Sequence, residues 1–275
     1  MAAALGGSAR WWHLVSVRPE DLLAVKEAMH RASEVLLRHA ETDVPFELKD
    51  GSSPVTAADR EIDALLRGML PGPGDGWLSE ESDDDPRRLA CRRIWIVDPL
   101  DGTRSFVARR PEYAVSIALV VDGVSVLGAV GNPASGVSVV GGPGLALEVH
   151  GDPALAWPEP AAPLRVLASR SEWRRGEWAR FQAAIAVLPQ GSVAYKLALV
   201  AAGFADATWT LHPKHEWDVA AGAALVAAAG GEVWLPRGGL VQWNRSRPLF
   251  RGFAAARPGL RPRVEALVSS ARDPA

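Results

Sequence analysis

The sequence is poor in cysteine, has no excess of either charge and contains no long apolar run. Its 275 residues include one cysteine, Cys91, which excludes an internal disulfide and any metal site built from several cysteines. Neither sign of charge dominates, since 30 basic residues stand against 32 acidic ones, and this balance argues against binding of a nucleic acid polymer. No apolar run approaches the roughly 18 residues of a membrane span. We therefore expect a cytoplasmic protein with no membrane partner.

Apolar residues make up 48% of the chain, which is enough to bury a sizeable core. Prolines cluster in residues 153–163. Because proline interrupts helices and central strands, this stretch predicts a joint between two halves. The expected halves are residues 1–152, with most of the candidate site residues, and residues 164–275.

Helical and strand patterns alternate without a strict rhythm. Apolar residues recur every three or four positions over residues 19–40 and 57–70, which predicts two amphipathic helices. The β-branched runs 113–121 and 124–130 flank Asp122-Gly123, which is a hairpin signal. Further helices are predicted at 173–187, 193–202 and 218–229, and further strands at 93–97, 164–168 and 232–235. The mixture predicts a layered α/β sandwich.

The sharpest chemical signal is the run Asp98-Pro99-Leu100-Asp101-Gly102-Thr103, at the end of an apolar strand. Its two carboxylates lie three residues apart, and the Gly-Thr step can open a helical turn whose N–H groups face an anion. Carboxylates repel a neighbouring anion unless a cation lies between them, and a hard divalent metal meets that need. On these residues alone, an ordinary Asp-Pro-Gly turn is an equal explanation.

Other acidic residues stand at element boundaries. Glu80 and Glu81 follow a short apolar step, and Asp218 begins an alanine-rich helix, where it also suits an N-cap. Acidic clusters without cysteine and with few histidines favour an all-oxygen magnesium site over a zinc site. Asp59, three residues after Thr56, fits either a capping box or a catalytic role.

Four motifs in this order resemble the inositol monophosphatase family. They are Ser53-Pro54-Val55-Thr56-Ala57-Ala58-Asp59, Ser79-Glu80-Glu81-Ser82, Trp95-Ile96-Val97-Asp98-Pro99-Leu100-Asp101-Gly102-Thr103 and Trp217-Asp218-Val219-Ala220-Ala221-Gly222. The resemblance implies a five-layer αβαβα sandwich. It also implies a magnesium-dependent, lithium-sensitive phosphomonoesterase with two or three Mg²⁺ ions, a small phosphate ester as substrate and a homodimer.

The resemblance also implies roles for individual residues. The oxygens that would bind metal belong to Glu80, Asp98, Leu100 (its backbone carbonyl), Asp101 and Asp218. Asp59 and Thr103 would orient the attacking water, and the Thr103 hydroxyl would complete the metal shell. The N–H groups of Gly102 and Thr103 would hold the phosphate.

Within the family, the chain resembles the bacterial 3′(2′),5′-bisphosphate nucleotidase branch. The segments that carry this resemblance are Ala168-Ser169-Arg170-Ser171, Gly191-Ser192 with Lys196, and Glu216 before Trp217-Asp218. Arg170 and Lys196 would then neutralise a second phosphate, which makes adenosine 3′,5′-bisphosphate the expected substrate. A plain surface cation is the alternative for Arg170.

Several alternatives stay open at this point. Leu211 stands where inositol phosphatases carry a glutamate that binds a ring hydroxyl, which counts against an inositol phosphate substrate. The rival functions are an inositol or other sugar monophosphatase and a non-catalytic metal- or phosphate-binding protein on the same scaffold. The residues that fit either a substrate contact or a plain loop are His212, His215, Arg109 and Arg110.

Overall fold

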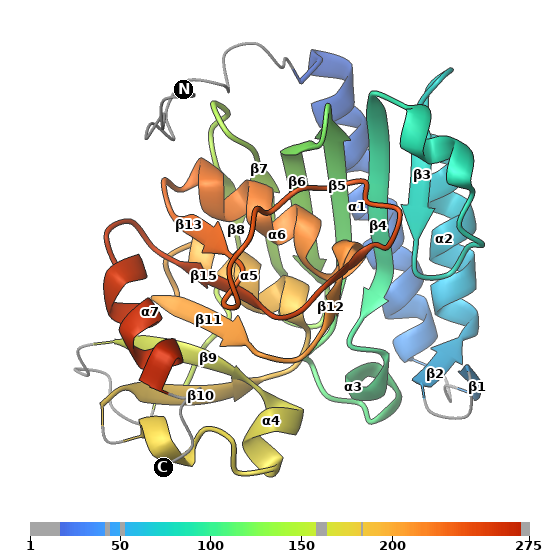
Figure 1. Cartoon of the computed structure of the whole chain (residues 1–275). Coiled ribbons are helices and arrows are strands. Elements are labelled where there is room, and N and C mark those ends of the chain that lie inside the picture. The colour runs from blue at the N-terminus through green and yellow to red at the C-terminus, as the bar shows by residue number, and fades with distance from the viewer. Residues whose placement is uncertain (1–16, 42–44, 50–52, 158–163, 183, 271–275) are drawn as a thin grey trace, which may run out of the picture.

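The computed structural model describes residues 17–41, 45–49, 53–157, 164–182 and 184–270. Helical and sheet layers alternate across the molecule (Figure 1), and this αβαβα order confirms the predicted fold class. The layers are α1 (Pro19–Ala40) with α2 (Ala57–Met69), a six-stranded sheet, α5 (Val193–Ala201) with α6 (Glu216–Ala228), a five-stranded sheet, and the outer helices α4 (Arg170–Arg174) and α7 (Arg261–Ser270).

Helices α1 and α2 form because each has an apolar stripe along one face. Pro19 takes the first position of α1, where its missing N–H leaves no helical hydrogen bond unmade. The buried stripe includes Val25 and Ala32 of α1 and Ile62 and Leu66 of α2, which pack against one face of the six-stranded sheet. Both predicted helices are confirmed.

The six-stranded sheet positions the acidic residues. Its strands, in spatial order, are β3 (Gly76–Ser79), β4 (Arg93–Asp101), β5 (Ala114–Val121), β6 (Val124–Asn132), β7 (Val137–Gly141) and β8 (Glu148–His150). Strand β3 runs parallel to β4 with Ser79 opposite Val97, which brings Glu80 beside Asp98. The predicted hairpin between β5 and β6 is confirmed, and both Asp122 and Gly123 have the positive φ of a type I′ turn.

The middle layer packs unusually close to its neighbours because small residues face each other. A Cβ at Gly222 of α6 would lie 2.3 Å from Cβ of Leu197 in α5. A Cβ at Gly128 of β6 would lie 2.3 Å from the carbonyl oxygen of Ala221. Since neither position admits a side chain, both glycines are required for α6 to lie between α5 and the sheet.

The five-stranded sheet forms the other side of the middle layer. Its spatial order is β10 (Ala186–Gln190), β9 (Arg165–Ser169), β11 (Ala207–Thr210), β15 (Phe253–Ala256) and β13 (Glu232–Trp234). Two small sheets complete the described part of the chain, β1 (Phe46–Lys49) with β2 (Ser53–Thr56) and β12 (Lys214–His215) with β14 (Leu249–Phe250). Strand β2 leads directly into α2, and β12 leads directly into α6.

The predicted helix over residues 173–187 is wrong. Helix α4 ends at Arg174, and Gly176 then takes a φ of 75°, a conformation that stops a right-handed helix. The last residues of the stretch join β10, which pairs in parallel with β9. Pro189 is tolerated there because β10 is an edge strand. Of the predicted joint, residues 158–163 lie outside the described residues, and the division into halves stays a prediction.

Candidate active site

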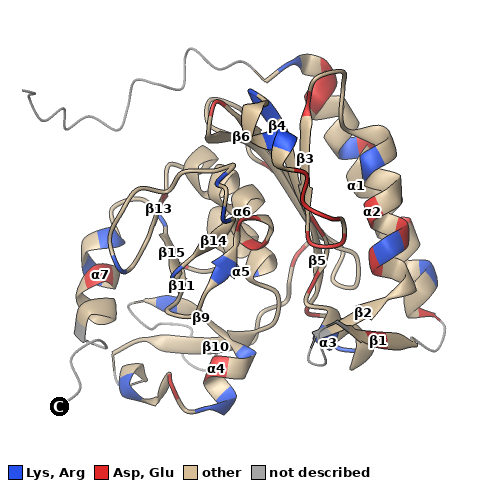
Figure 2. Cartoon of the chain, turned by 45° about the vertical axis from the view of Figure 1, so that its right-hand side comes forward, with Lys and Arg blue, Asp and Glu red and all other residues tan. Residues whose placement is uncertain are grey.

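Three carboxylates from separate parts of the chain meet between the two large sheets. Glu80 follows β3, Asp98 lies in β4 and Asp218 lies in the first turn of α6. Each offers a carboxylate oxygen, and these three oxygens lie within 4.8 Å of one another. In Figure 2, acidic segments drawn in red after β3 and near the start of α6 occupy the middle of the molecule. The sequence predicted these three residues to come together.

The buried carboxylate of Asp98 is only partly satisfied by hydrogen bonds. Asp98 is 1% exposed, and while its Oδ1 accepts a hydrogen bond from the Leu100 N–H at 3.0 Å, its Oδ2 has no hydrogen-bond partner. Burial raises the pKa of Asp98 well above its usual range, and the charges of Glu80, Asp101 and Asp218 raise it further. A buried, unpartnered carboxylate oxygen facing other carboxylates fits a bound cation, and an all-oxygen donor set suits a hard divalent ion such as Mg²⁺.

The pKa of the Asp218 carboxyl is raised as well. Burial raises the pKa of Asp218 to about 6, and the charge of Asp101 also raises it. The cation Lys214 and the N–H of His215, which donates to Asp218 Oδ2 at 2.9 Å, oppose the rise. The expected N-cap role of Asp218 is wrong, because α6 begins at Glu216 and its N-cap is His215. Asp218 lies at the third helical position, where it accepts the His215 N–H as in a capping box and also faces the acidic cluster.

Asp101 lies beside the cluster but is anchored elsewhere. Its Oδ2 accepts hydrogen bonds from the Ser192 hydroxyl at 2.7 Å and from the Ala194 N–H at 2.6 Å, both at the start of α5. Its charge nevertheless raises the pKa of Asp98 and Asp218, so it contributes to the same field. Asp101 thus ties the acidic cluster to the middle helical layer.

The buried Asp59 forms a second contact at the site, with the partly exposed Thr103. Asp59 Oδ2 accepts hydrogen bonds from the N–H and the hydroxyl of Thr56, at 2.7 and 2.6 Å, as a capping residue does. Its Oδ1 lies 3.3 Å from the Thr103 hydroxyl, which also lies 3.0 Å from the Leu100 carbonyl oxygen. The cap and the contact with the active-site turn therefore coexist on the two oxygens of one carboxylate.

Gly102 allows the chain to turn from β4 into the short helix α3 (Thr103–Val107). Its φ of 100° lies in the left-handed region, and a Cβ there would approach the Glu112 carbonyl oxygen to 2.8 Å. Without this glycine, Thr103 could not follow the acidic strand end so directly.

Most of these residues line a single cleft of about 540 Å³. Its acidic lining residues are Glu80, Asp101 and Asp218. The turn at Gly102 and Thr103 forms part of its wall, and the basic residues around it include Arg170, Lys196 and Lys214. Asp59 and Asp98 are buried behind this wall. The cleft thus places anion-attracting and cation-attracting groups within one cavity.

Arg170 lines the cleft but is held by an ion pair. Its Nε donates to Glu112 Oε2 at 2.6 Å and its Nη2 donates to Glu112 Oε1, while Nη2 also lies 3.1 Å from the Pro189 carbonyl oxygen. Glu112 Oε2 accepts a further hydrogen bond from the Gly191 N–H at 3.1 Å. Arg170 is therefore a partly buried, paired cation rather than a free surface charge.

Lys196 is a buried cation within the apolar helix α5. Its Nζ donates to the carbonyl oxygens of Ser192 at 3.0 Å and Gln190 at 3.4 Å. Burial lowers the pKa of Lys196 to about 8, against the opposing charge of Asp101, and the nearby charge of Lys214 lowers it further.

The site residues predicted from the sequence do not include Glu112 and Lys214, and Ser192 is named there only as part of a segment that resembles the nucleotidase branch. Ser192 has a φ of 56° and accepts the Tyr195 N–H while donating to Asp101, so it joins α5 to the acidic side. Glu112 acts on residues 58 and 79 positions away. The only available signal was an acidic residue immediately before an apolar strand, and that signal says nothing about its distant partners.

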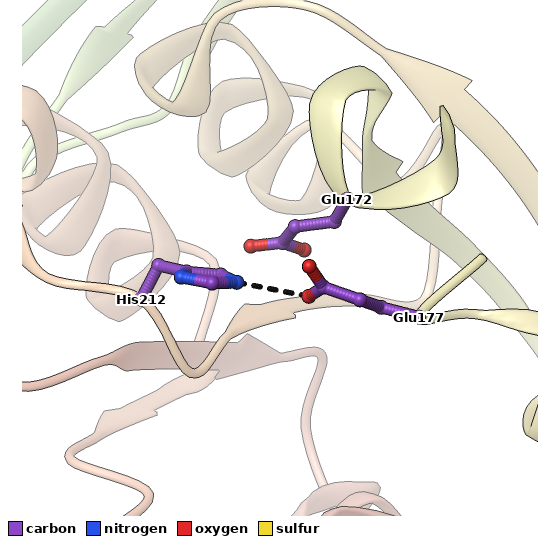
Figure 3. Close-up of side chains that lie close together, drawn as sticks. All are labelled: Glu172, Glu177 and His212. Atoms are coloured by element: carbon purple, nitrogen blue, oxygen red, sulfur yellow. Dashed lines mark hydrogen bonds and ion pairs between the residues drawn. The ribbon is translucent and has the colours of Figure 1, made fainter. Parts of the chain in front are cut away.

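Other candidates lie elsewhere. His212 belongs to a cluster with Glu172 and Glu177 (Figure 3), in which His212 Nε2 lies 2.9 Å from Glu177 Oε2. None of these three lines the cleft. His215 stacks on Trp217, with ring centroids 4.3 Å apart.

Arg109 and Glu216 have structural partners. The Arg109 guanidinium donates to the Ala40 carbonyl oxygen at 3.1 Å. Its neighbour Arg110 lines the cleft. Glu216 is buried and accepts the N–H groups of Asn244 and Arg245 at 2.8 and 3.0 Å, so it anchors that loop.

Comparisons with known proteins agree with this geometry. Residues 18–271 match the profile of the inositol monophosphatase family. An inositol-1-monophosphatase of Mycobacterium leprae is 37% identical over 204 residues, which cover 68% of this chain and 69% of that protein. A 3′-phosphoadenosine 5′-phosphate phosphatase of the same organism is 33% identical over 254 residues, which cover 84% and 87%. The crystal structure of CysQ from Bacteroides thetaiotaomicron superposes with a TM-score of 0.71 at 28% identity, covering 86% of this chain and 97% of that one.

The fold and the acidic cleft define a metal-dependent phosphatase that hydrolyses phosphate monoesters. The chain belongs to the inositol monophosphatase family. In the part of the chain that the structure describes, no helix combines the length and apolar character needed to cross a membrane.

Proposed function

We propose that this phosphatase is a magnesium-dependent 3′(2′),5′-bisphosphate nucleotidase that hydrolyses adenosine 3′,5′-bisphosphate. The observation that supports it most is one cleft that is lined both by the acidic residues Glu80, Asp101 and Asp218 and by basic residues, which include the buried Lys196. An acidic side can hold divalent cations, and a basic side can hold an anionic group of the substrate that is not hydrolysed.

In this proposal the acidic side holds two or three Mg²⁺ ions. Their ligands would be the carboxylates of Glu80, Asp98, Asp101 and Asp218, together with the Leu100 carbonyl and the Thr103 hydroxyl. When bound, Mg²⁺ lowers the pKa of water and neutralises charge on phosphoryl and leaving oxygens. The unpartnered Oδ2 of Asp98 is the oxygen most clearly available for this role.

Asp59 and Thr103 would orient the attacking water. When the Thr103 hydroxyl donates its proton to Asp59 Oδ1, the Thr103 oxygen is left as an acceptor for one proton of a water. Asp59 is itself fixed by two hydrogen bonds from Thr56, so the direction of this acceptor is set before substrate arrives. The N–H groups of Gly102 and Thr103 would bind the phosphate. Positioning of this kind is the main contribution that a protein makes to phosphoryl transfer.

The preference for a nucleotide is supported by two residues. Lys196 supplies a buried positive charge, which together with the paired Arg170 suits a second phosphate. Leu211 packs against the apolar core around Trp209 and Phe181 and does not line the cleft. No glutamate therefore stands at this position to accept a hydrogen bond from a sugar ring hydroxyl.

An inositol or other sugar monophosphatase is the second candidate. It is supported by the 37% identity to an inositol-1-monophosphatase, which exceeds the identity to the phosphoadenosine phosphatase over a shorter stretch. The homodimer stays a prediction in either case.

The deciding experiment is a comparison of kcat/KM with Mg²⁺ for adenosine 3′,5′-bisphosphate and inositol 1-phosphate. We expect kcat/KM to be at least about 100-fold higher for the bisphosphate, because about two additional charge-assisted contacts would contribute a difference of that size. The reverse order would make the sugar phosphatase the function. No turnover of either ester with intact Mg²⁺ binding would favour the non-catalytic binding protein.

A further inference from the structure

Among the residues that the structure describes, two lysines of the cleft form no ion pair with a carboxylate. Lys196 and Lys214 both line the cleft. Among the residues that the structure describes, neither ammonium group lies within 4.0 Å of a carboxylate. Lys196 is 4% exposed, and its hydrogen bonds go to neutral carbonyl oxygens. A buried charge without a counter-ion is costly, so this pair is suited to an anion brought by a ligand.

Arg170 differs from both lysines in this respect. Its guanidinium makes two parallel hydrogen bonds to Glu112, so its positive charge is already balanced inside the protein. An anion entering the cleft would have to compete with Glu112 for Arg170, whereas neither Lys196 nor Lys214 forms an ion pair within the described part of the chain. The lysines are therefore the cations more readily available to an entering anion.

The backbone of Lys214 is held close to the acidic side. Strand β12 pairs with β14, with Lys214 opposite Phe250, and α6 with Asp218 begins two residues later. Lys196, Lys214 and Asp218 all line the same cleft. Lys214 thus lines the cleft from the strand just before α6, whereas Lys196 lines it from α5.

Two different anion sites can therefore be distinguished within the cleft. A phosphoryl group undergoing hydrolysis has to lie beside Thr103 and the acidic cluster. An anion shared by Lys196 and Lys214 would lie on the basic side of the same cleft and would relieve the repulsion between the two ammonium groups. Such an anion is a second group on the substrate.

We infer that Lys214 is a specificity-determining residue, whose ammonium group joins that of Lys196 in binding a second phosphate on the alcohol part of the substrate. The inference rests on the proposed phosphatase function. Lys214 would contribute to the binding of substrates with two phosphates and not to the binding of substrates with one.

The test compares two nucleotides that differ only in the second phosphate, adenosine 3′,5′-bisphosphate and adenosine 3′-monophosphate. In Lys214→Met, we expect KM for the bisphosphate to rise about tenfold with kcat nearly unchanged, as for the loss of one charge-assisted contact. KM for the monophosphate should stay within about twofold. Lys214→Arg, which keeps the charge, should restore most of the difference.

Arg174→Met is the matched control, because Arg174 also lines the cleft but is exposed. We expect it to change KM for both nucleotides by less than about twofold. An equal loss on both nucleotides in Lys214→Met would overturn the inference, since Lys214 would then act only through the field at Asp218.

A binding measurement separates this inference from the proposed function. Adenosine 5′-monophosphate carries only the second phosphate, and calorimetry should show its Kd rising about tenfold in Lys214→Met. If the wild-type protein turned over neither nucleotide, the proposed function would fail, and this titration would still test the subsite. An unchanged Kd would contradict the role of Lys214.

Discussion

Within the described residues, two clusters bring potential metal ligands together, and one of them contains a buried carboxylate oxygen that has no hydrogen-bond partner. Glu80, Asp98 and Asp218 form the first, and Glu172, Glu177 and His212 form the second. In both, the ligand atoms lie within 4.8 Å of one another. Proximity of suitable atoms therefore does not distinguish a metal site from an ordinary polar network.

The difference lies in what compensates the carboxylates. In the second cluster, Trp178 and Thr210 donate to the two oxygens of Glu172, and Arg175 donates to Glu177. Burial alone would raise the pKa of Glu177, but the hydrogen bonds from Arg175 and His212 outweigh it and lower that pKa.

In the first cluster the pKa values move the other way. Burial and neighbouring carboxylates raise the pKa of Asp98 and Asp218, and one oxygen of Asp98 has no partner. A buried carboxylate oxygen without a hydrogen-bond partner, rather than the mere presence of acidic side chains, therefore distinguishes the first cluster as the candidate cation site.

The largest expected effect is on turnover. Asp98→Asn removes one negative charge at nearly constant volume, and we expect kcat/KM to fall by about 1000-fold or more because cation-dependent charge stabilisation is lost. The matched variant in the other cluster, Glu177→Gln, should stay within about twofold. Circular dichroism should show both variants folded. Near-normal turnover in Asp98→Asn would remove the first cluster from the mechanism.

A second effect concerns stabilisation by metal. At a Mg²⁺ concentration of about 100 times Kd, binding to the native state adds about 2.7 kcal/mol to the free energy of unfolding. We expect this gain in the wild-type protein and in Glu177→Gln, measured by thermal or urea unfolding. Asp98→Asn should lose most of it. An equal Mg²⁺ response in all three proteins would show that the ion binds elsewhere.

The two clusters should also respond to pH with opposite signs in metal-free protein. The pKa of Asp218 is raised from 3.8 to about 6, so its contribution to stability is full below 3.8 and is lost as pH rises through 6. The lowered pKa of Glu177 gives a contribution that is present above 4.5 and is lost as pH falls.

Urea unfolding from pH 4 to pH 7 can measure both contributions as differences from variants. Relative to Asp218→Asn, the wild-type protein should lose on the order of 1 kcal/mol as pH rises. Relative to Glu177→Gln, it should gain a few tenths of a kcal/mol, because the half-exposed Glu177 is screened by solvent. Slopes of the same sign for both pairs would contradict the contrast between the clusters.

The smallest expected effect comes from removing the cation of the second cluster. Arg175 is 49% exposed in its side chain, so Arg175→Met should lower the free energy of unfolding by about 0.5 kcal/mol or less. Turnover should not change. A loss of activity comparable to that of Asp98→Asn would mean that the network around Glu172 controls the cleft.

Much of the fold follows from local pattern. The helices over residues 19–40 and 57–70 and the hairpin at Asp122-Gly123 are confirmed, because periodic apolar residues and a two-residue turn determine them locally. The stretch 173–187 could not be resolved in this way. Its alanines and aromatic residues fit a helix, but Gly176 and the pairing of β10 with β9 decide the outcome, and strand pairing depends on distant residues.

The residues of the candidate site also differ in whether a local sequence pattern predicts them. Glu80, Asp98, Asp101 and Asp218 stand in short motifs at element boundaries, so their positions were accessible from the sequence. Glu112 and Ser192 act across long sequence separations, on Arg170 and Asp101, and no local pattern reveals such pairs. The role of Lys214 could not be predicted from the sequence, because it depends on the charge of Asp218 nearby in the folded chain.

Anomalous diffraction from crystals soaked in Mn²⁺, a substitute for Mg²⁺ with a measurable anomalous signal, tests the candidate cation site directly. We expect a peak enclosed by Glu80, Asp98 and Asp218 and no peak between Glu172, Glu177 and His212. A peak only at the second cluster, or no peak beside Asp98, would show that the unpartnered oxygen of Asp98 does not mark a cation site.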